Sequence, residues 1–413
     1  MLKPGPRNLI TDVDGILVGN AEDQRVRSGV SVVLCDPPAT ASVDVRGGAP
    51  GTRETDLLDP MARVDRIDAI CLSGGSAFGL SSADGVMRWL RDQGRGVAIG
   101  DIVVPIVPTA ILFDLLNGGD KKWQWPPYRE LAYQAADTAG TEFALGNAGA
   151  GLGAKAGDLK GGLGSASAVD PASGLQVGAL VAVNARGYTT MGSMPQFWAW
   201  ALEQDGEFGG LPPPRHGLGL PVSHNRADLS HDPADAVRSD PRANTTIAVV
   251  ATNAKLDKAS AKRLAVMAQD GLARSIRPVH TPQDGDTVFA IATGRHDVGT
   301  DPLALGELGT LAADCLARAV ARGVYNAASL GAARGWPVTA ACCSGATTAG
   351  PAGAVPSAGR SPVGLKRSET LPTPRAGMGS PMRSCLVWVA RAWRQKYCAA
   401  SWVPPLTGCG CTS

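Results

Sequence analysis

The sequence predicts a large α/β protein, and three features of its 413 residues support this fold class. Apolar segments of strand length alternate with segments whose apolar residues recur every three or four positions, as in helices. Hydrophobic residues make up 44% of the chain and charged residues 18%, which is enough for a large core. Several of the 52 glycines cluster in stretches that separate these segments. A chain of this length could form two or three domains, although a large α/β unit can also be a single domain.

The first 168 residues are expected to contain short strands, two helices and glycine-rich loops. Residues 76–94 have apolar side chains at mixed spacings of three and four and end at Gly94, which is typical of a helix. A second helix is expected at residues 128–140. The expected strands cover residues 10–20, 29–36, 67–75 and 96–116, and the expected loops cover residues 44–60 and 146–168.

The second half begins with a buried strand at residues 175–187 and then changes character. Residues 203–243 are polar, contain six prolines and have no sustained periodicity, which predicts a long exposed linker. Such a long loop inside a compact domain usually signals function or processing. After the linker we expect a strand at 245–253, a helix at 258–276, a hairpin formed by 277–281 and 286–294, and a helix at 306–327.

Charge and hydropathy exclude several classes of protein. Residues 334–413 contain nine Lys/Arg and one acid, so the rest of the chain has 30 basic and 36 acidic residues. A mildly acidic body argues against a nucleic-acid partner. The N-terminus lacks the apolar core of a signal peptide. The longest apolar stretch, which starts at Ile102, contains two prolines and is too short to span a membrane. We therefore expect a cytoplasmic protein with no membrane partner.

Residues 334–413 are expected to be an irregular, disordered tail because their composition shows no clear period. The abrupt change in composition suggests a frame-shifted end. Six cysteines lie in this tail, but their spacing does not give the paired C-x2-C pattern of a zinc site. Cys35, Cys71 and Cys315 lie among apolar residues and are expected to be reduced core thiols.

The most informative short segment is Asn244–Thr245, which follows the linker and precedes an apolar run. A threonine hydroxyl is a weak nucleophile, but an N-terminal threonine can use its own α-amine as the base. That amine has an ordinary pKa near 7.7–8.0, so part of it is neutral near pH 7. An internal threonine acquires such an amine only if the bond before it is cut. Taken alone, however, Asn-Thr-Thr before a strand is also compatible with a purely structural role.

The order of several segments strengthens the interpretation, because residues 8 to 330 resemble the self-processing P1-family (DmpA-type) peptidases of family S58. This group includes the β-aminopeptidases and the 6-aminohexanoate-oligomer (nylon-oligomer) hydrolase. The matching segments are ITDVDGILVG, DVRGGAPGTRETDLL, LSGGSAFGLSSADGVMRWL, VPIVPTAILFDL, GNAGAGLGAKAGDLKGGLGSAS, NTTIAVVATNA and HTPQDGDTVFAIATG.

The resemblance implies an αββα sandwich of the DmpA and ornithine acetyltransferase-like type, which is an N-terminal nucleophile hydrolase. It implies a single hydrolase domain, residues 1–333, cut into an α fragment (1–244) and a β fragment (245–333). It also implies a homo-oligomer of αβ units that acts on a small amide or short peptide with a free amino end. No metal ion or organic cofactor is implied.

The functional positions of the family can be carried over where the motifs match. Thr245 is expected to be the nucleophile, and Asn184 in AVNARG matches an asparagine that serves the oxyanion. Asp284 and Asp286 in QDGDT match acidic or polar residues near the nucleophile, where they would orient the amines. Without the resemblance, Asp284 would be read as part of a hairpin turn and Asn184 as a residue at a strand end.

Two positions are less clear from the sequence. Lys160 is a candidate for proton transfer or oxyanion binding, and Lys155 in the same glycine-rich loop competes for that role. Some relatives have a tyrosine that contacts the nucleophile where this chain has Phe113, which lacks a hydroxyl. Substrate preference is therefore expected to differ from that of those relatives.

Other chemistry is less well supported by the sequence. Gly74–Phe78 does not complete the G-x-S-x-G motif of a Ser76 hydrolase, because phenylalanine replaces the second glycine. The glycine-rich loop lacks the context of a dinucleotide site. A triad of His280 and Asp284 with a hydroxyl nucleophile remains an alternative. Two further classes stay open: a self-processing acyltransferase and a catalytically inactive binding protein.

Overall fold

The computed structural model describes residues 2–192, 194–214, 244–299, 301–328 and 330. The chain divides into two units, Met1–Thr347 and Thr348–Ser413, and all described residues belong to the first. Most of the expected linker and the whole expected tail lie outside the described residues. Among those described, no helix is both long enough and apolar enough to cross a membrane.

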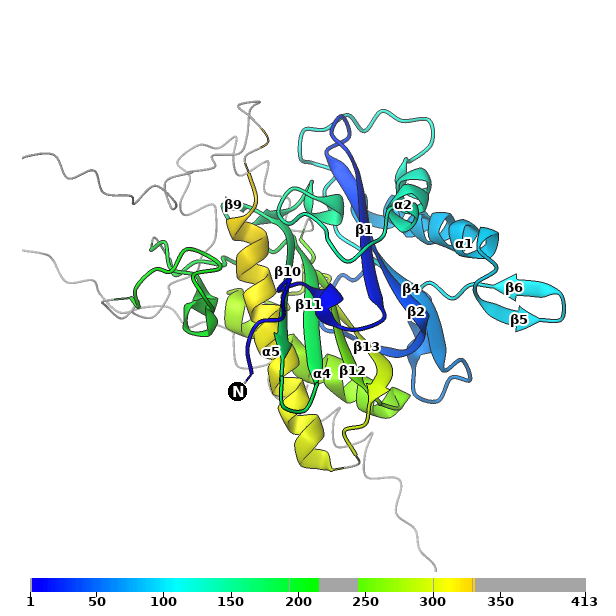
Figure 1. Ribbon diagram of the computed structural model, residues 1–413. Helices are drawn as coiled ribbons and strands as arrows, with labels where there is room; N and C mark the ends of the chain where they lie inside the picture. The colour runs from blue at the N-terminus through cyan, green and yellow to red at the C-terminus, as the bar shows by residue number, and fades with distance from the viewer. Residues whose placement is uncertain (1, 193, 215–243, 300, 329, 331–413) are drawn as a thin grey trace, which may run out of the picture. The chain divides into compact units, whose positions relative to one another are not determined.

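Strands and helices alternate along the first unit (Figure 1). The helices are α1 (Ser82–Asp92), α2 (Tyr128–Asp137), α4 (Lys258–Ser275) and α5 (Pro302–Tyr325). Short 3-10 helices are η1 (Ile10–Asp12), η2 (Asp56–Leu58), η3 (Ser76–Ser81), η4 (Gly149–Gly151) and η5 (Trp198–Leu202). The strands are β1 (Ile16–Asp23), β2 (Ser28–Val45), β3 (Thr52–Arg53), β4 (Arg66–Ser73), β5 (Val97–Ile99), β6 (Ile102–Val104), β7 (Thr109–Ile111), β8 (Lys155–Ala156), β9 (Leu159–Lys160), β10 (Gly162–Val169), β11 (Gln176–Val183), β12 (Ile247–Ala254) and β13 (Thr287–His296).

The main sheet has the order β10-β11-β12-β13-β2-β4-β7-β3, and β1 pairs with β2. The 18-residue strand β2 joins its two halves. Residues 28–35 of β2 pair with β1, whereas residues 40–45 pair with β13. A register shift between Leu34 and Ala39 in the pairing with β4 separates these two parts. β12 and β13 run parallel, and their neighbours β11 and β2 run antiparallel to them.

Three hydrophobic clusters show how the sheet halves and helices are layered. Along β11 and β12, Val181 and Val250 belong to the cluster that contains residues of α4 and α5. Their neighbours Leu180 and Val249 belong to a second cluster, which also contains residues of β1, β2 and β4. The opposite face of β2 and β4 packs on α1 and α2 in the third cluster. Because strand side chains alternate between faces, these clusters build four layers in the order helix, sheet, sheet, helix.

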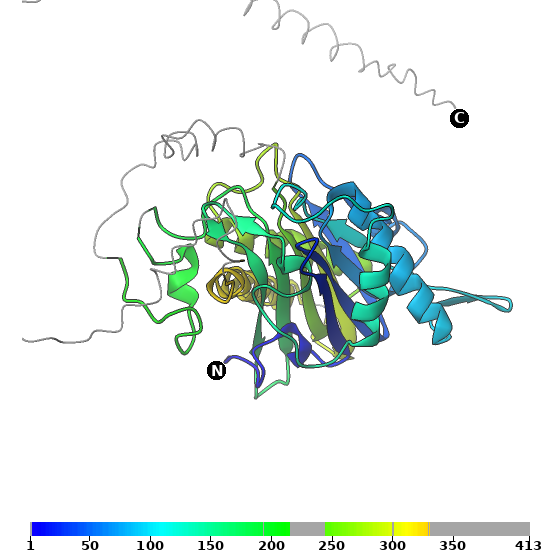
Figure 2. The ribbon, with the colours of Figure 1, turned by 90° about the horizontal axis from the view of Figure 1, so that it is seen from above.

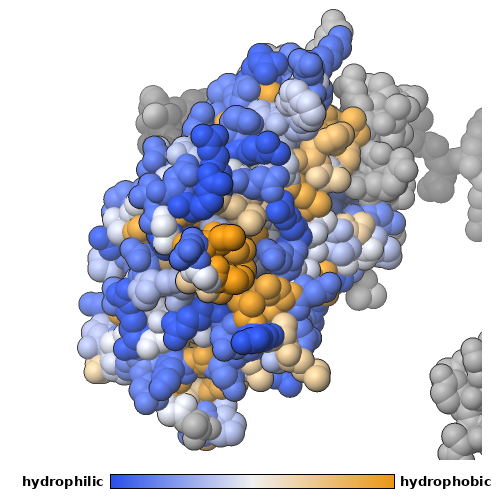
Figure 3. All heavy atoms as spheres, turned by 90° about the vertical axis from the view of Figure 1, so that its right-hand side faces the viewer, coloured by the Kyte–Doolittle hydropathy of each residue, from blue (hydrophilic) through white to orange (hydrophobic). Residues whose placement is uncertain are grey.

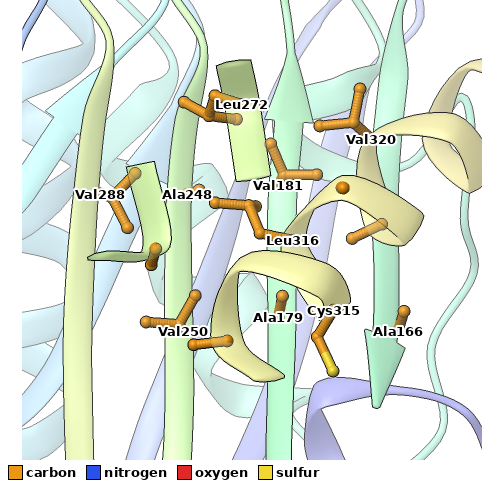
Figure 4. Close-up of a cluster of buried hydrophobic side chains, with 14 of the residues drawn as sticks. Ala166, Ala179, Val181, Ala248, Val250, Leu272, Val288, Cys315, Leu316 and Val320 are labelled. Atoms are coloured by element: carbon orange, nitrogen blue, oxygen red, sulfur yellow. The ribbon is translucent and has the colours of Figure 1, made fainter. Parts of the chain in front are cut away.

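The pictures agree with this layering. Figure 2 shows α5 in yellow and the cyan helices α1 and α2 on opposite sides of the strands. In Figure 4, Leu316 of α5 lies over β11 and β12, near Val181 and Ala248. The α/β fold class expected from the sequence is therefore confirmed, and the arrangement is that of an αββα sandwich.

The three cysteines outside the tail behave as expected. Cys35, Cys71 and Cys315 are free and buried. Burial raises the pKa of each thiol to about 12, so these thiols stay protonated at neutral pH.

The prediction of a loop throughout residues 146–168 was wrong, because Gly162–Val169 forms β10 at the edge of the sheet. The glycines there allow close packing against α5 rather than a turn. A Cβ at Gly164 would lie 1.9 Å from the carbonyl oxygen of Ala319, and one at Gly162 would lie 2.4 Å from that of Gly323. Side chains at these positions would push the helix away from the strand.

The predicted hairpin at residues 277–294 was also wrong. Only Thr287–His296 is a strand, and it pairs with β12 and β2. Arg277 instead forms an isolated bridge with Tyr188. The expected strand at 96–116 is divided into the hairpin β5–β6, which forms a separate small sheet, and β7.

The hairpin β5–β6 extends from the body of the unit (Figure 1) and carries exposed apolar side chains. Val97, Ile99 and Ile102 are 39%, 64% and 67% exposed. Figure 3 views the molecule from this side and shows apolar residues gathered among polar ones.

The packing of α5 makes a stability prediction. Leu316 is fully buried and lies in the cluster between α5 and the sheet. Leu316→Ala is expected to lower the free energy of unfolding by about 2–5 kcal/mol, because it removes apolar contacts and leaves a cavity. Leu303 on the same helix is 74% exposed, so Leu303→Ala should change it by less than about 0.5 kcal/mol. Urea unfolding of the two variants would contradict this packing if their losses were equal.

Candidate active site

Thr245 lies two residues before β12 and is only 4% exposed. Its backbone N–H donates to the carbonyl oxygen of Asn184 over 2.6 Å. Its hydroxyl Oγ1 donates to the carbonyl oxygen of Asn244, 2.5 Å away. The hydroxyl of the expected nucleophile is therefore next to the carbonyl group of the bond before it.

Asp286 holds the backbone of Thr246, which follows Thr245, and that of His280. Its Oδ1 accepts from the backbone N–H of Thr246 over 3.0 Å. Its Oδ2 accepts from the backbone N–H of His280 and lies 2.9 Å from the His280 Nδ1 atom. The carboxylate is 1% exposed, so these contacts are protected from water. Asp286 thus holds the residue after Thr245 in place.

His280 pairs with Asp286, and the hypothesis of a His280–Asp284 pair does not fit this arrangement. The backbone of His280 has φ +55°, a left-handed conformation. This conformation turns the chain so that the backbone N–H and the ring both meet the same carboxylate oxygen.

Asp284 is 2% exposed and has two different oxygen environments. Its Oδ2 accepts from the N–H and the hydroxyl of Thr281, at 3.0 and 2.6 Å. Within the described residues, its buried Oδ1 has no hydrogen bond of good geometry. Burial raises the pKa of Asp284, and the nearby Asp286 carboxylate raises it further. Hydrogen bonds from Thr281 and from the Arg186 backbone offset part of that rise.

The segment that carries both aspartates is held by the loop expected at residues 44–60, to which the sequence analysis gave no part in the site. Residues 46–49 hydrogen-bond to it through backbone atoms: Arg46 N–H donates to the Asp286 carbonyl, and Ala49 N–H donates to that of Asp284. A Cβ at Gly47 would lie 2.3 Å from the Asp286 nitrogen. The adjacent glycines in the expected loop at 44–60 were the available sequence signal for this close approach.

Gly285 brings this segment against Thr245. A Cβ at Gly285 would lie 2.7 Å from Thr245 Oγ1 and 2.7 Å from the Ala49 carbonyl oxygen. Only a residue without a side chain fits between these two atoms. Gly285 was not predicted as a site residue, because the sequence presents it only as part of an Asp-Gly turn.

Asn184 follows β11 and is 2% exposed. Its Nδ2 donates to the Phe113 carbonyl oxygen over 3.0 Å, and its Oδ1 accepts from the Lys155 N–H over 3.0 Å. These two contacts fix the orientation of the amide, while the Asn184 backbone carbonyl binds Thr245. Phe113 is half-buried and joins this part of the site through its backbone.

Lys160 is buried, and its Nζ donates to the carbonyl oxygens of Gly151, Ala154 and Gly161 at 2.7–3.0 Å. The lysine thereby links two turns of the glycine-rich loop. Burial lowers its pKa to about 7, and the charge of Asp114 opposes this shift. Lys155, its competitor in the sequence, reaches Asn184 through its backbone N–H.

Among the described residues there is no group of three or more His, Cys, Asp or Glu side chains arranged to hold a metal ion. Thr245, Asn184, Asp284 and Asp286 do meet: Asn184 binds the Thr245 N–H, and the two aspartates flank Gly285 against Thr245. The site is thus a buried hydroxyl beside a backbone carbonyl, with Asn184 bound to the Thr245 N–H and Asp286 bound to the Thr246 N–H.

The family model that matches residues 8–338 is described as peptidase family S58. The chain belongs to peptidase family S58. The resemblance seen in the sequence segments is therefore confirmed, and the chain is a peptide-bond hydrolase of an aminopeptidase family.

Two curated relatives illustrate the range of the family. An uncharacterized aminopeptidase of Mycobacterium tuberculosis is 47% identical over 340 residues, which cover 78% of this chain and 94% of that protein. The 6-aminohexanoate-oligomer endohydrolase of a Kocuria species is 27% identical over 306 residues, covering 72% of this chain and 78% of the relative.

Solved structures show the same fold at low sequence identity. An L-aminopeptidase D-Ala-esterase/amidase from Ochrobactrum anthropi, described as a variant of the Ntn hydrolase fold, matches with a TM-score of 0.57 and 22% identity, covering 79% of this chain and 88% of that one. A β-aminopeptidase from a Burkholderia species matches with a TM-score of 0.56 and 22% identity, covering 78% and 88%. The fold is therefore the Ntn hydrolase fold.

The contact between Gly285 and Thr245 makes the first prediction for the site. Gly285→Ala is expected to displace the Thr245 hydroxyl, because its methyl group has no room between Oγ1 and the Ala49 carbonyl. Peptidase activity should fall by about 100-fold or more, since small displacements in an active site have effects of that size. Gly306→Ala on α5 has open space around the new Cβ and serves as the control. Equal activity of both variants in an amide-hydrolysis assay would contradict this geometry.

The burial of Lys160 makes a prediction about pH. A lysine whose pKa is about 7 when folded loses its proton above that pH, whereas it stays protonated in the unfolded chain to about pH 10.4. In this window the unfolded state binds more protons, so stability from this group rises with pH. Relative to that of Lys160→Met, the free energy of unfolding of the wild type should therefore rise by up to about 1.4 kcal/mol per pH unit between pH 7 and about 10. Urea unfolding at several pH values measures the difference, and a constant difference would mean that the ammonium stays charged.

Proposed function

We propose that this chain is a self-processing aminopeptidase that cuts itself between Asn244 and Thr245 and then uses Thr245 as an N-terminal nucleophile. One observation carries the proposal: the buried Thr245 hydroxyl lies 2.5 Å from the Asn244 carbonyl oxygen, while the Thr245 N–H is held by Asn184. This short contact supports an attack of the hydroxyl on the adjacent carbonyl carbon.

Self-cleavage would proceed in two steps. Thr245 Oγ1 attacks the Asn244 carbonyl carbon, the bond from that carbon to the Thr245 nitrogen breaks, and the hydroxyl proton ends on the released amine. Water then hydrolyses the resulting ester, which restores the hydroxyl and leaves a carboxylate on Asn244. The products are an α fragment that ends at Asn244 and a β fragment that begins at Thr245.

The new α-amine would then act as the base for the neighbouring hydroxyl. The Asn184 carbonyl, which accepts from the Thr245 N–H before cleavage, would hold that amine afterwards. The hydroxyl attacks the carbonyl carbon of the substrate, the amine passes the proton to the leaving nitrogen, and water hydrolyses the acyl-enzyme. The Asn184 side-chain amide, oriented by Phe113 and Lys155, would donate to the developing oxyanion.

The two aspartates would have separate roles. Asp286 holds the Thr246 backbone and so fixes the direction in which Thr245 points. Asp284 presents a buried oxygen, Oδ1, which would bind the ammonium of the enzyme or of the substrate. Ionisation of Asp284 is costly when the site is empty, because burial and Asp286 raise its pKa, and a bound ammonium would favour the charged form.

The substrate class follows from the relatives as much as from the site. The names of two similar proteins, a 6-aminohexanoate-oligomer endohydrolase and a β-aminopeptidase, refer to amides of ω-amino and β-amino acids. We therefore propose a small amide or short peptide with a free amino end. Lys160, whose pKa burial lowers to about 7, would support the glycine-rich loop beside Asn184 and exchange a proton near that pH.

Substitution of Thr245 tests the proposal directly. Thr245→Ala should remain one intact chain on a denaturing gel and lose at least about 1,000-fold in amide hydrolysis, because both the nucleophile and its amine are lost. Thr245→Ser keeps the hydroxyl and should still give two fragments. Thr246→Ala is the matched control: it removes a neighbouring buried hydroxyl and should still be cut before residue 245. A wild-type protein that stays intact and inactive, or a cut Thr245→Ala, would overturn the proposal.

A further inference from the structure

Asp114 is a buried acid to which the proposed mechanism gives no role. It lies three residues after β7 and is 3% exposed. Its Oδ1 accepts from the Gly75 N–H over 2.8 Å. Burial raises its pKa, and the nearby charge of Lys121 and the hydroxyl of Ser28 offset part of that rise. Burying a carboxyl group costs free energy unless the surrounding contacts compensate for the lost water.

Two glycine turns enclose the other oxygen of this carboxyl group. A Cβ at Gly74 would lie 2.4 Å from Asp114 Oδ2, and a Cβ at Gly153 would lie 2.3 Å from the same atom. Asn117 completes the junction by donating to the carbonyl oxygens of Arg27 and Gly153. The carboxyl group therefore fills the space between the turn at residues 73–76 and the turn at residues 149–154.

The residue before Asp114 and the turn at residues 149–154 both lead directly to Asn184. Phe113, which precedes Asp114, accepts the hydrogen bond from Asn184 Nδ2. Lys155, two residues after Gly153, donates to Asn184 Oδ1. The two atoms that orient the Asn184 amide thus belong to the residue next to Asp114 and to the segment that begins at Gly153, against which the Asp114 carboxyl group packs.

We propose that Asp114 is a positioning residue that keeps the side-chain amide of Asn184 aimed at the reacting carbonyl by holding these two segments together. The inference rests on the proposed function, because it assigns Asp114 a task only if Asn184 serves the oxyanion. Asp114 touches no reacting atom and acts through Phe113 and Lys155. This positioning depends on the hydrogen bond to Gly75 and on the fit of the carboxyl group between Gly74 and Gly153, and it does not require a negative charge.

Three substitutions and a matched control test the inference by the split between kcat and KM. Asp114→Leu removes the acceptor for Gly75 and is expected to lower kcat by about 10- to 100-fold with KM changed less than about threefold, since only the transition state uses the oxyanion donor. Asp114→Asn keeps an acceptor oxygen and should retain kcat within about threefold. Should Asp114→Leu not fold, Asp114→Ser, whose side chain is too short to reach Gly75, is expected to show the same loss of kcat.

Asp68 supplies the control because its environment is similar. It is 2% exposed, its Oδ2 accepts from the Ile106 N–H over 2.9 Å, and its Oδ1 is buried without a close partner in the described part of the chain. Asp68→Leu should lower the melting temperature about as much as Asp114→Leu but leave kcat unchanged. An equal loss of kcat in both variants would overturn the inference, because it would reflect stability alone.

A double-mutant cycle with Asn184→Ala separates positioning from a general structural effect. If Asp114 acts through Asn184, the double variant should be no slower than Asn184→Ala alone. Additive losses, or full activity of Asp114→Leu, would overturn the inference while the self-processing of the wild type still stands. An intact and inactive wild type would instead overturn the proposed function, so the two failures are distinguishable.

Discussion

The start of β12 is the point on which the rest of the site depends, because three hydrogen bonds from different parts of the chain hold it. Asn184, at the end of β11, accepts from the Thr245 N–H. Asp286, before β13, accepts from the Thr246 N–H, and the Thr246 carbonyl accepts from Thr287. These bonds leave the Thr245 backbone little freedom, so its hydroxyl is directed by the sheet itself. A catalytic group built on rigid strands is held more accurately than one on a free loop.

The sequence predicted the fold class and the main site residues for different reasons. Alternating apolar segments were sufficient for an α/β protein, because strands such as β11 and β12 are buried on both faces and read as continuous apolar runs. Thr245, Asn184, Asp284 and Asp286 came from resemblance to a family, since an isolated Asn-Thr or Asp-Gly pair has common structural uses. The structure brings these residues together, and their chemical roles remain proposals.

The features that sequence reasoning missed involve glycines and partners distant in the chain. Gly162 and Gly164 looked like loop residues, yet they lie in β10 because α5 packs closely there. Gly285 looked like a turn residue, yet its lack of a side chain makes room for Thr245. Periodicity reports which face of one element is apolar, but it carries no information on how near another backbone comes. Likewise, only the fold determines that His280 meets Asp286 rather than Asp284.

The order of strands in the main sheet has a consequence for any cut before Thr245. β12 and β13, which would belong to the downstream piece, lie side by side with β11 on one flank and β2 on the other, and both of these come from the upstream piece. The downstream piece would therefore lie inside the sheet, with strands of the upstream piece on both sides of it, rather than at one edge. Pulling them apart would require breaking two rows of backbone pairing inside the hydrophobic interior, so a severed polypeptide would melt and refold as one cooperative body.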